Sequence, residues 1–274
     1  MKVGYTEFSF GYAFTENLIR SAPARPSGAP VFPNLNQEAQ LGYDVRINFP
    51  ASPLFFQYKL SELMVRTSAA EISQYGLPGI SVPFFRMPLM RRDLSEQHKL
   101  LIQLEGKFPG VVYYAAPGLE DNDAFNDAYN AAEVHLQSVF FSPTDIGPLP
   151  DDKQHAVAYG NGLAQAWLCS EPREISVFRF DVVEANATSL LHERRLRTLE
   201  DTAAEIRQAL LRLTSAEVRA SEGAIRQRIQ VRVGALGLAP AVDVRARAVA
   251  VELLVSREIA RVGLSLDMII VQPA

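Results

Sequence analysis

Two stretches in the first quarter of the chain alternate between apolar and polar side chains, which is the pattern of a half-buried β-strand. In YDVRINF, residues 43–49, the polar positions begin with Asp44 and apolar residues lie between them. In PLFFQYKL, residues 53–60, Gln57 and Lys59 share one face of the expected strand. A Pro-containing turn, PASP, separates the two runs. The pattern therefore predicts two neighbouring strands, each with polar side chains on one face.

The segments around these strands predict two helices and a further strand. FGYAFTENLIRSA, residues 10–22, predicts a short helix that starts near Thr15 and is ended by the following Pro- and Gly-rich residues. DLSEQHKLLIQLEGKFPG, residues 93–110, predicts a second helix with a polar start and a Gly/Pro stop. VVYYAAP, residues 111–117, is almost fully apolar and predicts a strand buried on both faces of a sheet. The Pro-rich stretch 76–90 predicts irregular structure.

The last third of the chain has the spacing of long helices. In 196–213, apolar residues recur at alternating steps of three and four, which is a heptad seam. These are Leu196, Leu199, Ala203, Ile206, Leu210 and Leu213. A second helix is predicted through Val218 to Leu236, a third through 244–263, and a final strand in LSLDMIIVQP, residues 264–273.

Composition divides the chain at the same point. Residues 184–274 contain no Phe, Tyr or Trp, whereas residues 1–183 are rich in aromatics, Pro and Gly. We therefore predict a mixed α/β domain over 1–183 and an α-helical domain over 184–274. Apolar stripes of the helical domain need each other or a second subunit, so this domain is predicted to form a homo-oligomer or to dock a partner.

Charge and cysteine content narrow the class of protein. The 274 residues carry a net charge of −4, which argues against a sequence-independent nucleic-acid coat but not against an enzyme that acts on DNA. A single cysteine, Cys169, excludes an internal disulfide, and a small buried side chain is its favoured role. No secretory signal and no apolar run long enough to cross a membrane is visible, so we expect a cytoplasmic protein.

The polar faces of the two expected strands carry side chains that can bind a metal ion or take part in catalysis. Gln57 and Lys59 are two residues apart on one strand, so their side chains leave the same face about 7 Å apart. If the strands are antiparallel neighbours, Asp44 meets them at one end of the sheet. A carboxylate and an amide carbonyl suit Mg²⁺, and an adjacent ammonium can offset charge on a phosphate. The alternative is a hairpin in which Asp44 pairs with Arg46 and Lys59 lies at an exposed edge.

The order helix, strands, helix, strand, with GYD and then FQYK, resembles the PD-(D/E)XK or restriction-endonuclease-like nuclease superfamily. The match is to the Mrr-like variant in which Gln replaces the acidic residue, and it covers residues 8 to about 117. The resemblance implies an αβββαβ core, Mg²⁺ or Mn²⁺ as cofactor and DNA as substrate. It implies that Asp44 and Gln57 are metal ligands and that Lys59 is the catalytic lysine. It also implies an acid from the first helix, which Glu16 matches, with Glu38 as the rival.

Other polar residues are weaker candidates. Arg86, Arg91 and Arg92 follow the Pro-rich stretch and are predicted to contact nucleic acid. For His98 and His155, a structural or surface role is favoured over catalysis.

The sequence thus predicts a metal-dependent nuclease that hydrolyses DNA phosphodiester bonds, in prokaryotic restriction or anti-phage defence. The alternative is an inactive nuclease-fold subunit that serves as a structural or nucleic-acid-recognition component of a multi-protein defence complex. The neutral Gln57 and the acidic net charge favour the alternative.

Overall fold

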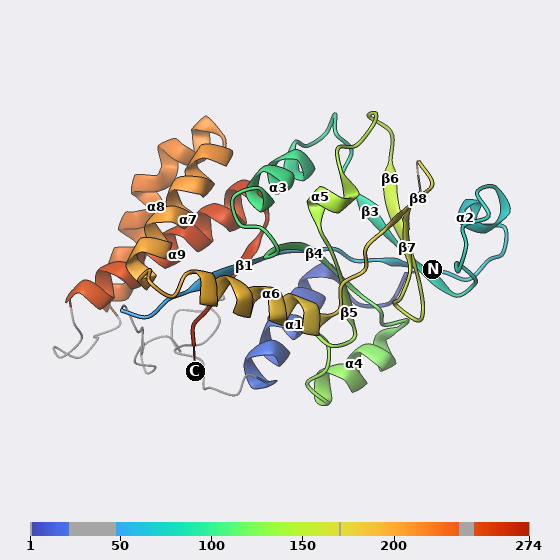
Figure 1. Ribbon diagram of the computed structural model, residues 1–274, viewed down its shortest axis with the longest axis horizontal. Coiled ribbons are helices and arrows are strands. Elements are labelled where there is room, and N and C mark those ends of the chain that lie inside the picture. Colours follow the sequence, from blue (N-terminus) through green and yellow to red (C-terminus); the bar gives the residue numbers. More distant parts are fainter. Residues whose placement is uncertain (1, 22–47, 170, 236–243, 274) are drawn as a thin grey trace. The chain divides into compact units, whose positions relative to one another are not determined.

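The computed structural model describes residues 2–21, 48–169, 171–235 and 244–273 (Figure 1). The described residues form two compact units, 2–21 with 56–185 and 48–55 with 186–273. Each unit is considered by itself. The described residues are mixed α/β, with two sheets and a C-terminal helical region.

The first unit contains most of the strands. Its helices are α1 (Glu7–Ser21), α2 (Ala70–Ser73), α3 (Gln97–Glu105), α4 (Asn122–Asn130), α5 (Pro143–Ile146) and the start of α6 (Phe180–Glu193). Its strands are the end of β1 (Ser52–Tyr58), then β2 (Glu62–Met64), β3 (Phe84–Leu89), β4 (Val112–Pro117), β5 (Ser138–Phe141), β6 (His155–Gly160), β7 (Ala166–Leu168) and β8 (Arg173–Ile175).

β4 is the central strand beside β1. All six of its residues are buried, as the apolar run at 111–117 predicts. On one side β4 pairs antiparallel with β5, in the register Tyr114 opposite Phe141, and on the other side it neighbours β1. Where β1 ends, the Lys59 N–H donates to the Ala115 carbonyl at 3.0 Å. The hydrogen bond to β4 therefore holds the backbone at Lys59, which is one of the predicted site residues.

The second sheet has the order β2-β3-β6-β7-β8, and all its pairs are antiparallel. Its strand β3 corrects the expectation of irregular structure across 76–90. Proline normally argues against a strand with two neighbours because it cannot donate to the ladder. Here Pro88 is exposed and pairs in register with Ala156, while Phe84 and Phe85 are fully buried. Burial of the aromatic side chains outweighs the missing donor.

Helix α1 begins at Glu7, eight residues before the start expected near Thr15. Thr6 supplies the cap, since its Oγ1 accepts the Ser9 N–H at 3.0 Å. Thr15 is instead buried in the middle of the helix, where its hydroxyl hydrogen-bonds that of Tyr58 at 2.9 Å. The helix is therefore longer and packs along the end of β1.

An aromatic cluster holds α1 against the sheet. Phe14 packs edge-on against Phe56 and Tyr58, with ring centroids 5.2 and 5.5 Å apart. Gly11 permits the close approach, because a Cβ there would lie 2.7 Å from the Tyr58 ring. These contacts place the second and third turns of α1 against the end of β1.

The second unit contains the start of β1, α7 (Leu199–Leu213), α8 (Ala216–Ala235), α9 (Val244–Leu264) and β9 (Asp267–Val271), which neighbours β1. The predicted seam is confirmed for Leu199, Ala203, Ile206 and Leu210, which are buried. The prediction that Leu196 belongs to the seam is wrong, since Leu196 precedes α7 and is 91% exposed. The reason is that Thr198 and Asp201 form a capping box, so the helix begins only after Thr198.

Candidate active site around Lys59

Lys59 directly follows the last residue of β1 and is only 8% exposed. Burial lowers the pKa of its ammonium, and the nearby Glu7 carboxylate partly opposes that shift. Within the described part of the chain, the ammonium makes no hydrogen bond or ion pair. A cation removed from water without a bonded partner is costly, so such groups concentrate at functional sites.

Gln57 is 4% exposed, and its amide is held by two neighbours. Its Oε1 accepts from Gln97 Nε2 at 2.8 Å, and its Nε2 donates to the Tyr58 carbonyl at 3.3 Å. Gln97 is the first residue of α3, so this bond joins the strand to that helix. A carbonyl oxygen has two lone pairs, which leaves one on Gln57 for a further donor or a cation.

Glu7 lies at the same end of β1. Its Oε2 accepts the Leu60 N–H at 3.3 Å, and its charge acts on the ammonium of Lys59. Glu7 is not among the residues predicted from sequence, because it stands before the predicted start of the helix. Helical spacing supplies the missing signal, since Glu7 falls on the same face as Gly11 and Phe14, the residues that pack against β1.

Glu16, the expected acid, lies elsewhere on α1. It is nine residues beyond Glu7, or about two and a half turns, which puts the two carboxylates on opposite faces and about 14 Å apart along the axis. Glu16 accepts from Asn17 Nδ2 at 2.9 Å and lies 3.6 Å from Arg20. The helix therefore presents Glu7, and not Glu16, to the end of β1. Asp44 and Glu38 lie outside the described residues.

The side chains around Lys59 can be compared with the ligands that the expected Mg²⁺ would need. Among the described residues there is no group of three or more His, Cys, Asp or Glu side chains placed to hold a metal ion. Among the described residues, the Glu7 carboxylate acts on the Lys59 ammonium, and the Gln57 amide lies two residues before Lys59 in the chain. Mg²⁺ is held through few protein oxygens and keeps several waters, so these donors suit it in kind.

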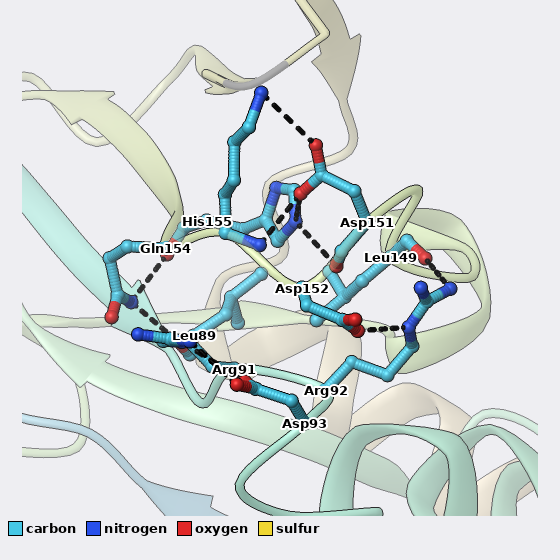
Figure 2. A network of polar contacts seen from close by, with 10 residues as sticks. Leu89, Arg91, Arg92, Asp93, Leu149, Asp151, Asp152, Gln154 and His155 are labelled. Carbon is cyan, nitrogen blue, oxygen red and sulfur yellow. Dashed lines mark hydrogen bonds and ion pairs between the residues drawn. The ribbon is translucent and has the colours of Figure 1, made fainter.

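The three arginines expected to contact nucleic acid are each paired with a carboxylate. Arg86 forms a bidentate pair with the buried Glu71 at 2.7 and 2.6 Å, which joins β3 to α2. Figure 2 shows Arg91 directed at Asp93 and Arg92 at Asp152, with closest contacts of 2.6 and 2.8 Å. The charge of each is therefore partly offset by a carboxylate, which weakens its attraction for a phosphate.

His155, on the same network, is buried and lies 3.1 Å from the Asp151 carboxylate (Figure 2). His98 is also buried, and its Nε2 lies 2.7 Å from the Gly147 carbonyl. Because a carbonyl only accepts, Nε2 carries the proton and Nδ1 accepts from the Tyr114 hydroxyl at 2.9 Å. Burial raises the pKa of the Cys169 thiol to about 12, so it is a poor nucleophile at neutral pH. The bonds of the two histidines fit structural roles.

Comparison with protein-family models, with curated proteins and with solved structures found no match for this chain. The resemblance to restriction-endonuclease-like nucleases therefore rests on the residues and element order given above. In the described parts of the chain, no helix has the length and apolar character needed to cross a bilayer.

Proposed function

We propose that this protein is a metal-dependent nuclease that hydrolyses DNA phosphodiester bonds at the site around Lys59. The observation that carries the proposal is the Lys59 ammonium, which is buried at the end of β1 with no bonded partner among the described residues. An anion that enters this site gains a charge interaction weakened little by solvent. A phosphate whose negative charge grows during hydrolysis gains most.

The neighbouring residues suit the supporting roles. Lys59 orients the attacking water and stabilises the additional charge on the phosphate. Gln57, fixed by Gln97, offers its second carbonyl lone pair to Mg²⁺ or Mn²⁺, with Asp44 as the further ligand expected from the family resemblance. Glu7 is the carboxylate that the fold of α1 brings to this end of the strand. The cation, when bound, supplies Lewis-acid polarisation of the phosphate.

The wider proposal follows the same resemblance. The elements α1, β1, α3 and β4 follow one another along the chain in the order of that resemblance, with β2, α2 and β3 inserted between β1 and α3. This partial agreement in order supports the proposal. Restriction-endonuclease-like cores in prokaryotes commonly serve restriction or anti-phage defence, and we propose that role here. The helices of the second unit are proposed to form a homo-oligomer, which would place two sites on two DNA strands.

The direct test is cleavage of plasmid and linear DNA by the full chain in Mg²⁺ or Mn²⁺. Lys59→Met keeps the length of the side chain and removes its charge, and it should lower the cleavage rate at least about a hundredfold, the scale for losing one group that stabilises developing charge. Asp44→Asn should do the same. Lys107→Met, an exposed lysine beyond α3, is the matched control. Cutting by Lys59→Met at the wild-type rate would refute the site.

A second function is favoured by one specific observation. The Gln57 carbonyl is already engaged by Gln97, and Arg86, Arg91 and Arg92 are paired with carboxylates. That pattern suits an inactive nuclease-fold subunit of a defence complex. Under this alternative the purified protein cuts no DNA with either cation, and it co-purifies with a partner protein of its own host.

A further inference from the structure

A cavity of about 600 Å³ lies among α7, α8 and α9 in the second unit. Its volume falls within the range of roughly 300–1,000 Å³ that is typical of small-molecule sites. Part of its wall is apolar and is contributed by Ala204 of α7, Val233 of α8, and Val244 and Ala248 of α9. Val244 is 84% exposed, so this wall is open to solvent.

A neutral group of ion pairs borders the cavity. Arg207 contacts Glu222 at 3.1 Å and Glu252 at 3.3 Å, and Arg226 contacts the same two carboxylates at 3.4 and 2.7 Å. Two cations and two anions thus balance, and their bonds join all three helices. This group links the three helices around the cavity and itself contributes no net charge to it.

The remaining charges of the cavity are unequal. Glu200 lines it but is paired with Arg245 at 2.6 Å. Arg247 also lines it and, within the described part of the chain, makes no hydrogen bond or ion pair. The first turn of α9, which includes Arg247, carries no acidic residue. One guanidinium is therefore available beside the apolar wall, and the positive end of the helix dipole adds to it.

We infer that this cavity binds a small amphipathic anion, with its acid group on Arg247 and its apolar body against Val233, Val244 and Ala248. A guanidinium donates paired hydrogen bonds to carboxylate or phosphate oxygens. The apolar body covers the exposed valine and gains from its removal from water. The cavity lies in a different unit from Lys59, so this binding does not depend on the proposed nuclease activity.

The test uses anilinonaphthalene sulfonate, a fluorescent anion with an apolar body, titrated into the full-length protein. We expect one saturable site. Arg247→Gln should raise Kd about three- to fivefold, the scale of one solvent-exposed ion pair. Ala248→Leu fills the cavity from an exposed position and should raise Kd at least about tenfold, because the apolar body loses its place. Thermal unfolding of both variants should match that of the wild type.

Arg212→Gln is the matched control, since Arg212 is an exposed arginine at the other end of α7, and its Kd should equal that of the wild type. Displacement by octanoate and by octyl phosphate distinguishes a carboxylate from a phosphate ligand. Octanol should displace the probe poorly. The inference is overturned if the wild type does not bind the probe, if Ala248→Leu binds it equally well, or if octanol competes as well as the two anions.

Discussion

At the residue scale, the contrast lies between Lys59 and the arginines of the same unit. Arg86, Arg91 and Arg92 each contact a carboxylate, whereas the Lys59 ammonium is buried and makes no such bond among the described residues. Packing alone gives no reason to bury a lysine in this way, because an apolar residue of similar length would cost less. The residue that folding explains least is therefore the residue to which we assign the chemistry.

The two acids of α1 allow a sharp test at this scale. Glu7→Gln and Glu16→Gln remove one charge each from opposite faces of one helix. We expect Glu7→Gln to raise the Kd for Mn²⁺ about tenfold, since losing one oxygen ligand or its charge weakens a hard-cation site. Glu16→Gln should leave that Kd unchanged. Calorimetric titration of Mn²⁺ in the absence of DNA measures binding independently of cleavage.

The Mn²⁺ titrations distinguish a failure of metal binding from a failure of the Glu7 assignment. If the wild type binds no Mn²⁺, the metal-dependent function itself fails. If the wild type binds but Glu16→Gln is the impaired variant, the assignment of Glu7 fails and the original family-based expectation stands.

At the element scale, the junction of α1 with β1 determines where the site groups lie. Gly11 and the aromatic rings of Phe14, Phe56 and Tyr58 hold the helix close to the strand. Glycine inside a helix normally costs about 1 kcal/mol relative to alanine. Its presence here is explained by the space that the Tyr58 ring requires.

Glycine-to-alanine substitutions should therefore have opposite effects in two helices. Gly11→Ala places a Cβ 2.7 Å from the buried Tyr58 ring, and overpacking of this kind should lower the free energy of unfolding by about 1–3 kcal/mol. Gly223→Ala in α8 meets no atom of the described residues within 4 Å and should raise the free energy of unfolding by about 0.5–1 kcal/mol through helix propensity. Urea denaturation measures both. Equal effects of the two substitutions would contradict the close packing of α1 on β1.

At the scale of the whole molecule, the two units differ in the groups they bury. The first unit encloses His98 and His135, and burial lowers the pKa of both imidazoles. His135 Nε2 lies 3.2 Å from the Ser21 hydroxyl, and its buried Nδ1 has no hydrogen-bond partner among the residues that the structure describes. In the second unit, the helical region has His192, which is exposed. Acid should thus act mainly on the first unit.

The direction in which stability changes with pH follows from proton uptake by the two histidines. The unfolded chain binds protons on these histidines near pH 6.5, whereas the folded chain binds them only at lower pH. Stability is therefore complete above about pH 6.5 and falls as pH decreases below it, by up to about 1.4 kcal/mol per pH unit for each histidine. We expect His135→Phe to reduce the loss of stability between pH 7.5 and 5.5, measured by thermal unfolding. His192→Gln is the control and should leave that loss unchanged.

The sequence by itself determined the elements whose signal is local. The apolar run of β4 and the seam of α7 depend on side-chain periodicity, which neighbouring residues set. The alternation around Gln57 predicts a half-buried strand, but β1 is buried on both faces from Ser52 to Gln57 and ends before Lys59. Local periodicity did not predict the strand β3 or the first turn of α1. Their stability comes from burial against distant segments and from the cap at Thr6. The prolines of 76–90 predict irregular structure from local preference alone, although tertiary packing accepts Pro88 within β3.

Only the tertiary structure decided which groups meet. The spacing along α1 allows either Glu7 or Glu16 to face the strand, and the choice follows from how Phe14 and Gly11 pack on β1. Likewise, no pattern along the chain pairs Gln57 with Gln97, forty residues away, or leaves Arg247 open beside a cavity. Such contacts join segments far apart in sequence, so they are fixed by the packing of whole elements and not by any local preference.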